Sequence, residues 1–454
     1  MENLIKKYEK EKSPYYTSYP TLGNWSESFS NFDFISSLKK FCLQKDNSFG
    51  LYVHFPYCQN KCYFCMCNSK VVHDEDKIRE FLQITSKELE LFKKFFEEQG
   101  VRPRIKYIHL GGGSPTIIGK KDLTDYIEKI KSIADTSELN EFSIEVDVRT
   151  IDIDKLNFYK QLGIDRLSFG IQDLDPDVQK AVNRIQPLEL IQPLVNFAKK
   201  NFKSINFDLL HGLPKQTRES FKKTLKIVKE LSPDRITLLR YCHIPEKAKI
   251  QRMINPLDLP SEEEKTKMFL EAKEFLKDAG YVHVGIDHFA KNTDELALCK
   301  KENFLCRDFN GFSPATTKNI IGIGPASTSS FGDCYSQNVY LSDYFSLLNK
   351  GEFPILKGYK LNKNDFIRRD LINGILCSNF LNFQQIGEKY EINPQDYFSK
   401  EFALLDSFVN DGIIEFSKDD LILNITKKGR IFARHVCKLF DDYLREQEYE
   451  VHGL

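Results

Sequence analysis

Residues 52–68 read YVHFPYCQNKCYFCMCN and place four cysteines in the spacing C-x3-C-x2-C-x-C: Cys58, Cys62, Cys65 and Cys67. The short apolar run at 51–54 is typical of a buried β-strand, so the cysteines follow a strand end. Thiolates this close together on one loop can converge on a single soft metal centre. Three thiolates on a cubane iron–sulfur cluster leave one iron free to bind a small molecule. This stretch therefore predicts a redox or metal site.

Two other chemistries fit parts of the same stretch. Zinc would use all four sulfurs, or three together with His54 or His73. The spacing weighs against zinc because no second C-x-x-C pair follows downstream. A dithiol redox pair at Cys62 and Cys65 is a further alternative, but it leaves Cys58 unexplained.

Beyond this loop, short apolar runs alternate with longer amphipathic stretches, which is typical of repeated βαβ units and a parallel sheet. We expect strands at 51–54, 105–110, 142–146, 166–171, 205–210 and 235–239, and a further strand within 281–290. Helices are expected at 81–95, 123–133, 188–197, 220–231 and 262–279. The pattern predicts an α/β protein with a partial (β/α)6 TIM-like barrel, whose active site lies at the carboxyl ends of the strands. A doubly wound open sheet is the main alternative.

The chain divides into four predicted segments. Residues 1–50 form an N-terminal arm, in which 13–20 (SPYYTSYP) reads as an ordered extension over another part of the molecule. Residues 51–290 form the barrel, and 291–360 form a barrel extension and substrate-side segment. Residues 361–454 form a helix-rich domain, with helices at 366–381, 402–409 and 432–444 and a hairpin within 412–425. That last arrangement resembles a winged helix, which leaves a binding role for nucleic acid or a partner open.

Composition narrows the class of protein. The 454 residues carry 65 basic and 65 acidic side chains, and a nucleic-acid-binding protein would usually carry a basic excess. The N-terminus is charged from its second residue, and no apolar run reaches the ~20 residues that span a bilayer. We therefore expect a cytoplasmic protein that binds neither membrane nor nucleic acid. Eleven cysteines in such a chain favour a metal or catalytic cluster over disulfides. The lack of a heptad pattern favours a monomer.

The cysteine loop resembles that of the radical S-adenosylmethionine (SAM) superfamily, and residues 52–68 as a whole are similar to the oxygen-independent coproporphyrinogen III dehydrogenases. Further similar blocks are spread along the chain: 16–21 (YTSYPT), 109–116 (HLGGGSPT), 145–147 (EVD), 165–172 (DRLSFGIQ), 207–216 (FDLLHGLPKQ), 287–290 (DHFA), 332–338 (GDCYSQN) and 426–430 (TKKGR). The resemblance therefore covers nearly the whole sequence.

The resemblance implies a 4Fe-4S cluster on Cys58, Cys62 and Cys65, with Cys67 beside it rather than on an iron. It also implies two SAM molecules. Expected SAM contacts are Tyr52, Phe64 through its backbone, Gly112, Gly113 and Ser114 for the methionine and adenosine portions, Glu145 for one SAM, Gln172 and Asp208 for the second, and Arg184 for a SAM carboxylate. Cys242 and Thr328 stand where the family usually has small or apolar residues that contact SAM through the backbone.

The implied activity is the oxidative decarboxylation of two propionates of coproporphyrinogen III, giving protoporphyrinogen IX in haem biosynthesis through a 5'-deoxyadenosyl radical. An electron-donor protein such as flavodoxin or ferredoxin is an implied partner. The alternative is a relative that binds or transfers haem. Arg307, Arg368 and Arg369 are candidate partners for propionates, and the alternative is that they are solvated surface charges. Tyr15, Asn310 and Phe312 depart from the family pattern on the substrate side.

Overall fold

A computed structural model describes residues 2–8, 11 and 13–445, and within these residues twelve strands form one mixed sheet. In spatial order they are β16 (Ile355–Lys360), β15 (Cys334–Asn338), β14 (Thr328–Phe331), β13 (Ile320–Ile323), β1 (Phe49–Phe55), β4 (Ile105–Gly112), β5 (Glu141–Val146), β6 (Arg166–Gln172), β7 (Ser204–His211), β8 (Arg235–Arg240), β10 (His288–Lys291) and β9 (Tyr281–Gly285). The neighbours from β13 to β8 run parallel, and the strands at both edges are antiparallel.

The parallel part of the sheet confirms the predicted partial barrel. All six expected parallel strands form, and they lie side by side in chain order (β1, β4, β5, β6, β7 and β8), as in a barrel rather than a doubly wound sheet. Two details differ from the expectation. β13 adds a seventh parallel strand beside β1, with Gly50 opposite Ile320. The segment 281–290 gives two antiparallel strands instead of one, because the chain reverses at Ile286, which has φ 38°.

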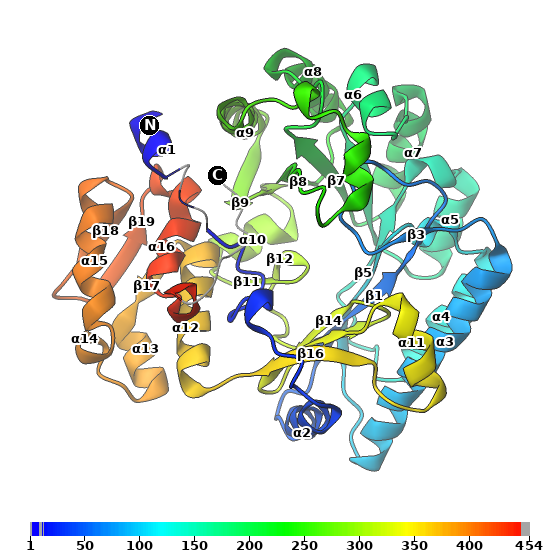
Figure 1. Ribbon diagram of the computed structural model, residues 1–454, viewed down its shortest axis with the longest axis horizontal. Coiled ribbons are helices and arrows are strands. Elements are labelled where there is room, and N and C mark those ends of the chain that lie inside the picture. The colour runs from blue at the N-terminus through cyan, green and yellow to red at the C-terminus, as the bar shows by residue number, and fades with distance from the viewer. Residues whose placement is uncertain (1, 9–10, 12, 446–454) are drawn as a thin grey trace.

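Helices cover the outer side of the parallel strands (Figure 1). They are α3 (Glu75–Glu98), α4 (Lys120–Ser132), α5 (Ile153–Gln161), α6 (Pro176–Ala181), α7 (Leu188–Asn201), α8 (Arg218–Leu231) and α9 (Glu262–Asp278). α3 shows why they form: Asp74 caps its first turn, its buried side chains include Phe81, Leu89 and Phe92, and Gly100 at φ 66° allows the chain to leave. All five expected helices are confirmed, and α5 and α6 are additional.

The N-terminal arm lies over both the barrel and the C-terminal domain. α1 (Glu2–Tyr8) contacts the C-terminal domain, where the Tyr8 hydroxyl donates to Asp411 Oδ2 over 2.6 Å. α2 (Asn31–Cys42) packs its aromatic face against the antiparallel strands, with the Phe34 ring 5.2 Å from that of Phe331. Between the helices, Tyr16 and Tyr19 are buried. The ordered extension predicted for 13–20 is therefore confirmed.

The C-terminal domain, at the left of Figure 1, combines helices with a small sheet. Its elements are α12 (Lys363–Asn373), a π-helical turn (Gly374–Ser378), β17 (Phe380–Asn382), α13 (Phe383–Tyr390), α14 (Pro394–Tyr397), α15 (Ser399–Asn410), β18 (Ile414–Ser417), β19 (Ile422–Ile425), α16 (Ala433–Leu439) and a closing turn of 3-10 helix (Asp442–Arg445). A core separate from that of the barrel includes Phe383, Phe398 and Phe432. Of the predicted outer segments, residues 1, 9, 10, 12 and 446–454 lie outside the described residues.

Two helix predictions in this domain were too long. The helix expected at 366–381 ends at Asn373, and after the π-helical turn Asn379 adopts φ 55°, so the chain reverses into β17. β17 adds a third strand to the expected hairpin by pairing with β19. The helix expected at 432–444 ends at Leu439 and is followed by Phe440, which is buried in the core.

Other elements lie outside these groups. β2 (Tyr57–Cys58) and β3 (Lys70–Val71) pair close to the cysteine loop, and α11 (Leu341–Asn349) packs against α3. α10 (Glu295–Lys301), β11 (Leu305–Asp308) and β12 (Gly311–Pro314) lie between the barrel and the C-terminal domain. β11 and β12 form a hairpin in which Arg307 pairs with Phe312. None of the helices in the described residues is both long enough and apolar enough to cross a membrane.

Candidate active site

The cysteine loop opens onto a cavity of about 140 Å³ at the carboxyl ends of the parallel strands. Most of the predicted site residues line it together: Cys58, Cys62, Phe64, Cys65, Gly112, Gly113, Glu145, Gln172, Arg184 and Asp208. They come from the loop after β1 and from the ends of β4, β5, β6 and β7, with Arg184 following α6. The topology thus gathers residues that are spread over 150 positions of sequence.

The four thiols are electrostatically different. The hydrogen bond between the thiols of Cys65 and Cys67 lowers the pKa of Cys65 to about 6 and raises that of Cys67. Burial raises the pKa of Cys58 to about 11. The cluster side of the cavity therefore favours a thiolate at Cys65 and a protonated thiol at Cys67. Among the described residues, no three His, Cys, Asp or Glu side chains lie close enough together to hold a single metal ion.

Two arginines lie against the sulfur of Cys62. Arg184 Nη1 is 3.4 Å and Arg149 Nη2 is 3.6 Å from Cys62 Sγ. Both pair with Asp147, at 3.5 and 2.7 Å. Burial would raise the pKa of Asp147, but the ion pairs with these arginines outweigh it and lower the pKa to about 2. The Cys62 sulfur therefore lies within hydrogen-bonding distance of two guanidinium groups.

The glycine loop after β4 packs against the strand that leads to the cysteines. A Cβ on Gly113 would lie 2.5 Å from the Tyr57 carbonyl oxygen, and one on Gly112 would lie 2.7 Å from His54 Nδ1. Gly112, at φ 105°, also donates its N–H to Glu145 Oε2 over 3.1 Å. Larger residues would push the two loops apart. Ser114 is buried behind this contact and does not line the cavity. Its N–H donates to the Tyr57 carbonyl oxygen, and its hydroxyl forms a hydrogen bond with that of Thr116.

Two carboxylates face the cavity from neighbouring strand ends. Glu145 lies 3.4 Å from His109 Nε2, and Asp208 accepts hydrogen bonds from Ser168 and Asn206 at 2.9 and 2.8 Å. Burial first, and then the charge of Glu145, raise the pKa of Asp208. Asp208 has no ion-pair partner among the described residues, so it can accept hydroxyl or ammonium hydrogens from a ligand.

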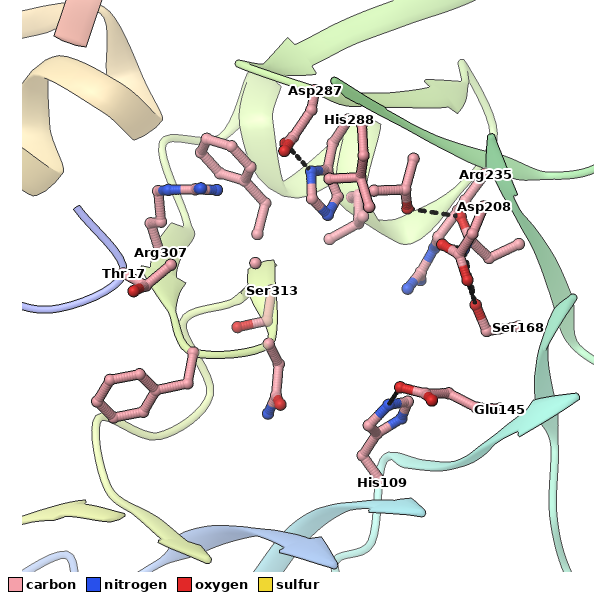
Figure 2. A pocket seen from close by; sticks show the side chains of 18 of the residues that line it. Thr17, His109, Glu145, Ser168, Asp208, Arg235, Asp287, His288, Arg307 and Ser313 are labelled. Atoms are coloured by element: carbon pink, nitrogen blue, oxygen red, sulfur yellow. Dashed lines mark hydrogen bonds and ion pairs between the residues drawn. The ribbon is translucent and has the colours of Figure 1, made fainter. Parts of the chain in front are cut away.

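A second and larger cavity, of about 560 Å³, adjoins the first. Phe64, Glu145, Ser168 and Asp208 line both. Its walls come from residues along β4 to β8, from Tyr15 and Thr17 of the arm, and from the β11–β12 hairpin. In Figure 2, Arg307 and Thr17 lie on one side of the open space, and Glu145, Ser168 and Asp208 lie on the other.

The other predicted residues are more dispersed. The Tyr52 ring stacks on His109 at 5.9 Å, and its hydroxyl bonds to His54; it lies behind Glu145 and lines neither cavity. Cys242 lines the larger cavity. Thr328 begins β14 and lines neither. The candidate propionate partners also separate: Arg307 lines the larger cavity, whereas Arg368 is ion-paired with Glu401 and Asp442 inside the C-terminal domain. Arg369 lines a neighbouring cavity of about 180 Å³.

Sequence reasoning missed Gln251, which is fully buried on the 3-10 helix Lys249–Met253. Its amide nitrogen lies 3.1 Å from the carbonyl oxygens of both Phe64 and Cys242, and its side-chain oxygen accepts from the Ile244 N–H over 2.6 Å. It therefore ties the cysteine loop to the loop after β8. No local pattern marks a glutamine in such a position. Arg149 was missed for the same reason, although its partner Asp147 lies in the quoted block 145–147.

The donor set fits an iron–sulfur cluster with SAM. Three thiols on one loop, one of them a favoured thiolate, match cluster ligands. Beside them, an unpaired carboxylate and a buried guanidinium match the ammonium, hydroxyl and carboxylate groups of SAM. These features, on a partial barrel, define a radical SAM protein. The model of the Radical SAM superfamily matches residues 52–228.

Whole-chain comparisons narrow this class. The chain is 36% identical to the oxygen-independent coproporphyrinogen III oxidase of Escherichia coli strain K12, over 98% of this chain and 95% of that protein. It is 35% identical to the protein of that name from Helicobacter pylori strain 26695, over 96% and 95%. A solved coproporphyrinogen III oxidase from Escherichia coli, described as a radical SAM enzyme, superimposes with a TM-score of 0.91 and 35% identity, over 98% of this chain and 99% of that one. The chain belongs to the family of oxygen-independent coproporphyrinogen III oxidases.

Proposed function

We propose that this protein converts coproporphyrinogen III to protoporphyrinogen IX without oxygen, by oxidative decarboxylation of two propionates, using a 4Fe-4S cluster and two SAM molecules. The observation that carries the proposal is the junction of the two cavities. The smaller holds the thiols, the larger has room for a bulky organic substrate, and Phe64, Glu145, Ser168 and Asp208 line both. A cofactor in the first can therefore reach a substrate in the second.

The reaction balances for each propionate separately. A hydrogen atom leaves the carbon β to the carboxylate, the bond to the carboxylate carbon breaks, and CO2 departs as the vinyl double bond forms. One electron leaves with the hydrogen atom, and a second must pass to a one-electron acceptor. When bound, the reduced cluster and SAM supply the one-electron chemistry that removes the hydrogen atom.

The chain's own residues would bind and orient these groups. We assign the cluster to Cys58, Cys62 and Cys65. Cys67 would lie beside the cluster as a protonated thiol. Glu145 and Asp208 would accept hydrogens from SAM at the junction, and Gln172 would add an amide there. Arg184 is buried with its guanidinium on the cavity wall, where it can bind a carboxylate. The arm residues Tyr15 and Thr17 line the larger cavity, where they would help to exclude water from the reacting carbon.

The proposal extends to partners. An electron-donor protein such as flavodoxin or ferredoxin would supply electrons to the cluster held by the cysteine loop. We also propose that the chain acts as a cytoplasmic monomer.

An anaerobic assay tests the function. The protein is reconstituted with iron and sulfide and incubated with dithionite, SAM and coproporphyrinogen III, and vinyl products and 5'-deoxyadenosine are measured by mass spectrometry. Both products together are expected. 5'-Deoxyadenosine without vinyl product would keep the radical chemistry but reject the substrate. Neither product, with the cluster loaded, would favour the alternative of a haem-binding or haem-transfer protein.

A further inference from the structure

Arg307 is held rigidly on the wall of the larger cavity by three parts of the chain. It lies on β11 and is only 6% exposed. Its backbone N–H donates to Asn373 Oδ1 over 3.2 Å, and its Nε donates to the carbonyl oxygen of Tyr15 over 2.9 Å. Its guanidinium carbon lies 4.7 Å from the centre of the Phe312 ring. The barrel hairpin, the arm and the C-terminal domain therefore fix the direction of this side chain.

The charge of Arg307 is only partly compensated by the protein: Asp287, whose pKa is lowered, against the effect of burial, by His288 and then by Arg307, lies nearby but forms no ion pair with Arg307 in the described residues. The other arginines that line this cavity are all paired: Arg166 with Glu141 at 2.8 Å, Arg235 with Asp294 at 2.9 Å, and Arg240 with Glu262 at 2.5 Å. Within the described residues, Arg307 has no ion pair, and its buried Nη1 has no hydrogen-bond partner. Leaving a guanidinium N–H buried and unpaired is costly, so such a group indicates a ligand of opposite charge.

Other donors lie near Arg307. His288 Nδ1 is 2.6 Å from Asp287 Oδ1, which leaves Nε2 facing the cavity beside Gly311. The centre of the His288 ring lies 5.4 Å from that of the Phe312 ring on β12. The amide nitrogen of Asn310 is also buried on this wall without a hydrogen-bond partner in the described part of the chain. These groups form a donor-rich wall, defined here as Arg307, His288 and Asn310.

The donor-rich wall faces the carboxylates across the cavity. Figure 2 shows Arg307 on the side opposite Glu145 and Asp208, the two acids at the junction with the cysteine cavity. Charges of both signs occur on each side, since Arg235 lies beside Asp208 and Asp287 lies beside His288. An anionic group of a substrate is nevertheless expected to bind at Arg307, because the other arginines of this cavity are already ion-paired.

We propose that Arg307 binds a carboxylate of the substrate that does not react in that turnover, with His288 and Asn310 as flanking donors. This deepens the proposed function and rests on it: coproporphyrinogen III carries propionates that remain after two have been converted. An anchor on the far wall directs another propionate toward the junction, where the hydrogen atom leaves. Arg307 thus favours a tetrapyrrole whose side chains carry free carboxylates.

The test compares binding and turnover in wild type, Arg307→Gln and Arg307→Lys, with Arg79→Gln as matched control because Arg79 is exposed on α3. The binding probe is coproporphyrin III, the unreactive oxidised tetracarboxylate, followed by fluorescence against its tetramethyl ester. Arg307→Gln is expected to weaken binding of the tetracarboxylate by about tenfold or more, the loss typical of a hydrogen bond to a charged group. The ester should bind weakly to both proteins, and Arg307→Lys should recover part of the loss.

In turnover, Arg307→Gln should raise KM for coproporphyrinogen III more than it lowers kcat. Iron content and binding of SAM by equilibrium dialysis should match wild type, which shows that the variant is folded. Unchanged binding of the tetracarboxylate by Arg307→Gln, or an equal loss for the ester, would overturn the proposal. If wild type binds the tetracarboxylate through Arg307 but forms no vinyl product, the anchor stands and the proposed function fails.

Discussion

The side-chain amide of Gln251 donates to the backbone carbonyl of Phe64 over 3.1 Å, and this contact joins two loops of the active site. Phe64 lies between two of the clustered cysteines, and the same amide also holds Cys242 in the loop after β8. Both loops were expected to contact SAM through their backbones. Gln251 contacts no sulfur and lines neither cavity, but it holds both loops in place. We therefore assign it as a positioning residue.

Gln251→Glu keeps the size of the side chain but places a carboxylate oxygen against two carbonyl oxygens. Each carbonyl left without its donor costs about 1–3 kcal/mol, so we expect SAM affinity to fall by at least about tenfold while the cluster remains loaded. Electron paramagnetic resonance of the reduced cluster with and without SAM measures this. Gln385→Glu, on the exposed face of α13, is the control. A normal SAM-induced spectral change in Gln251→Glu would contradict the assigned role.

The four cysteines should separate into two classes on replacement. Serine at position 58, 62 or 65 should remove most of the bound iron and the visible absorbance, because each loses a cluster ligand. Cys67→Ser should keep the iron. The hydrogen bond between the two thiols raises the pKa of Cys67 and lowers that of Cys65, so Cys67 stays protonated and is not a ligand. Iron and sulfide analysis after anaerobic reconstitution gives the answer. Loss of iron in Cys67→Ser comparable to that in Cys58→Ser would show that Cys67 is a ligand.

Arg149 should affect the reduction potential of the cluster. Its guanidinium lies 3.6 Å from Cys62 Sγ, and a positive group beside a cluster thiolate stabilises the more negative, reduced form. Arg149→Gln should therefore make the cluster harder to reduce and shift its midpoint potential to a more negative value. A potentiometric titration followed by electron paramagnetic resonance measures the shift, with the exposed Arg102→Gln as reference. An unchanged potential would show that the contact is without electronic effect.

Glu88 should give the fold a measurable pH dependence far from the active site. It is buried on α3, accepts hydrogen bonds from Tyr344, Gly324 and Asn338, and burial raises its pKa from 4.5 to about 7. The folded state holds this proton more tightly than the unfolded chain. The stabilisation is therefore present below about pH 4.5 and is lost as the pH rises through about 7, a change on the order of 3 kcal/mol.

Denaturant unfolding between about pH 5 and about pH 8 tests this dependence. In wild type, the free energy of unfolding should fall over this pH range by the amount that Glu88 contributes. Glu88→Gln should not show this part of the fall, because glutamine does not titrate. Glu97→Gln, exposed on the same helix, should keep the wild-type slope. Parallel curves for wild type and Glu88→Gln would rule out the assigned titration.

The periodic part of the fold was accessible from sequence, and the irregular part was not. The parallel strands carry regularly spaced apolar residues, as in β7, where Ile205, Phe207 and Leu209 alternate with polar residues, and the helices carry clear apolar faces, as in α3. β13 was missed because its four residues, IIGI, contain Gly322 and are followed at once by Gly324 and Pro325, so the stretch reads as a loop. The end of α12 was misplaced because the left-handed turn at Asn379 depends on packing in the small sheet rather than on a local pattern.

The site divides in the same way. The cysteines, Glu145, Gln172 and Asp208 could be predicted because parallel strands bring their carboxyl ends to one edge, and the structure places these side chains on one cavity. Thr328 and Ser114 lie off that cavity, and their predicted contacts stay predictions. Gln251 and the isolation of Arg307 depend on which groups remain unpaired after folding, a property that no spacing in the sequence encodes.

Transfer of a labelled hydrogen tests the central claim most directly. Coproporphyrinogen III carrying deuterium at the propionate carbons β to the carboxylates is incubated anaerobically with the reconstituted wild-type protein, dithionite and SAM. The account predicts that 5'-deoxyadenosine gains deuterium in step with the appearance of vinyl groups. Vinyl product with unlabelled 5'-deoxyadenosine, or labelled substrate recovered intact beside 5'-deoxyadenosine, would contradict it.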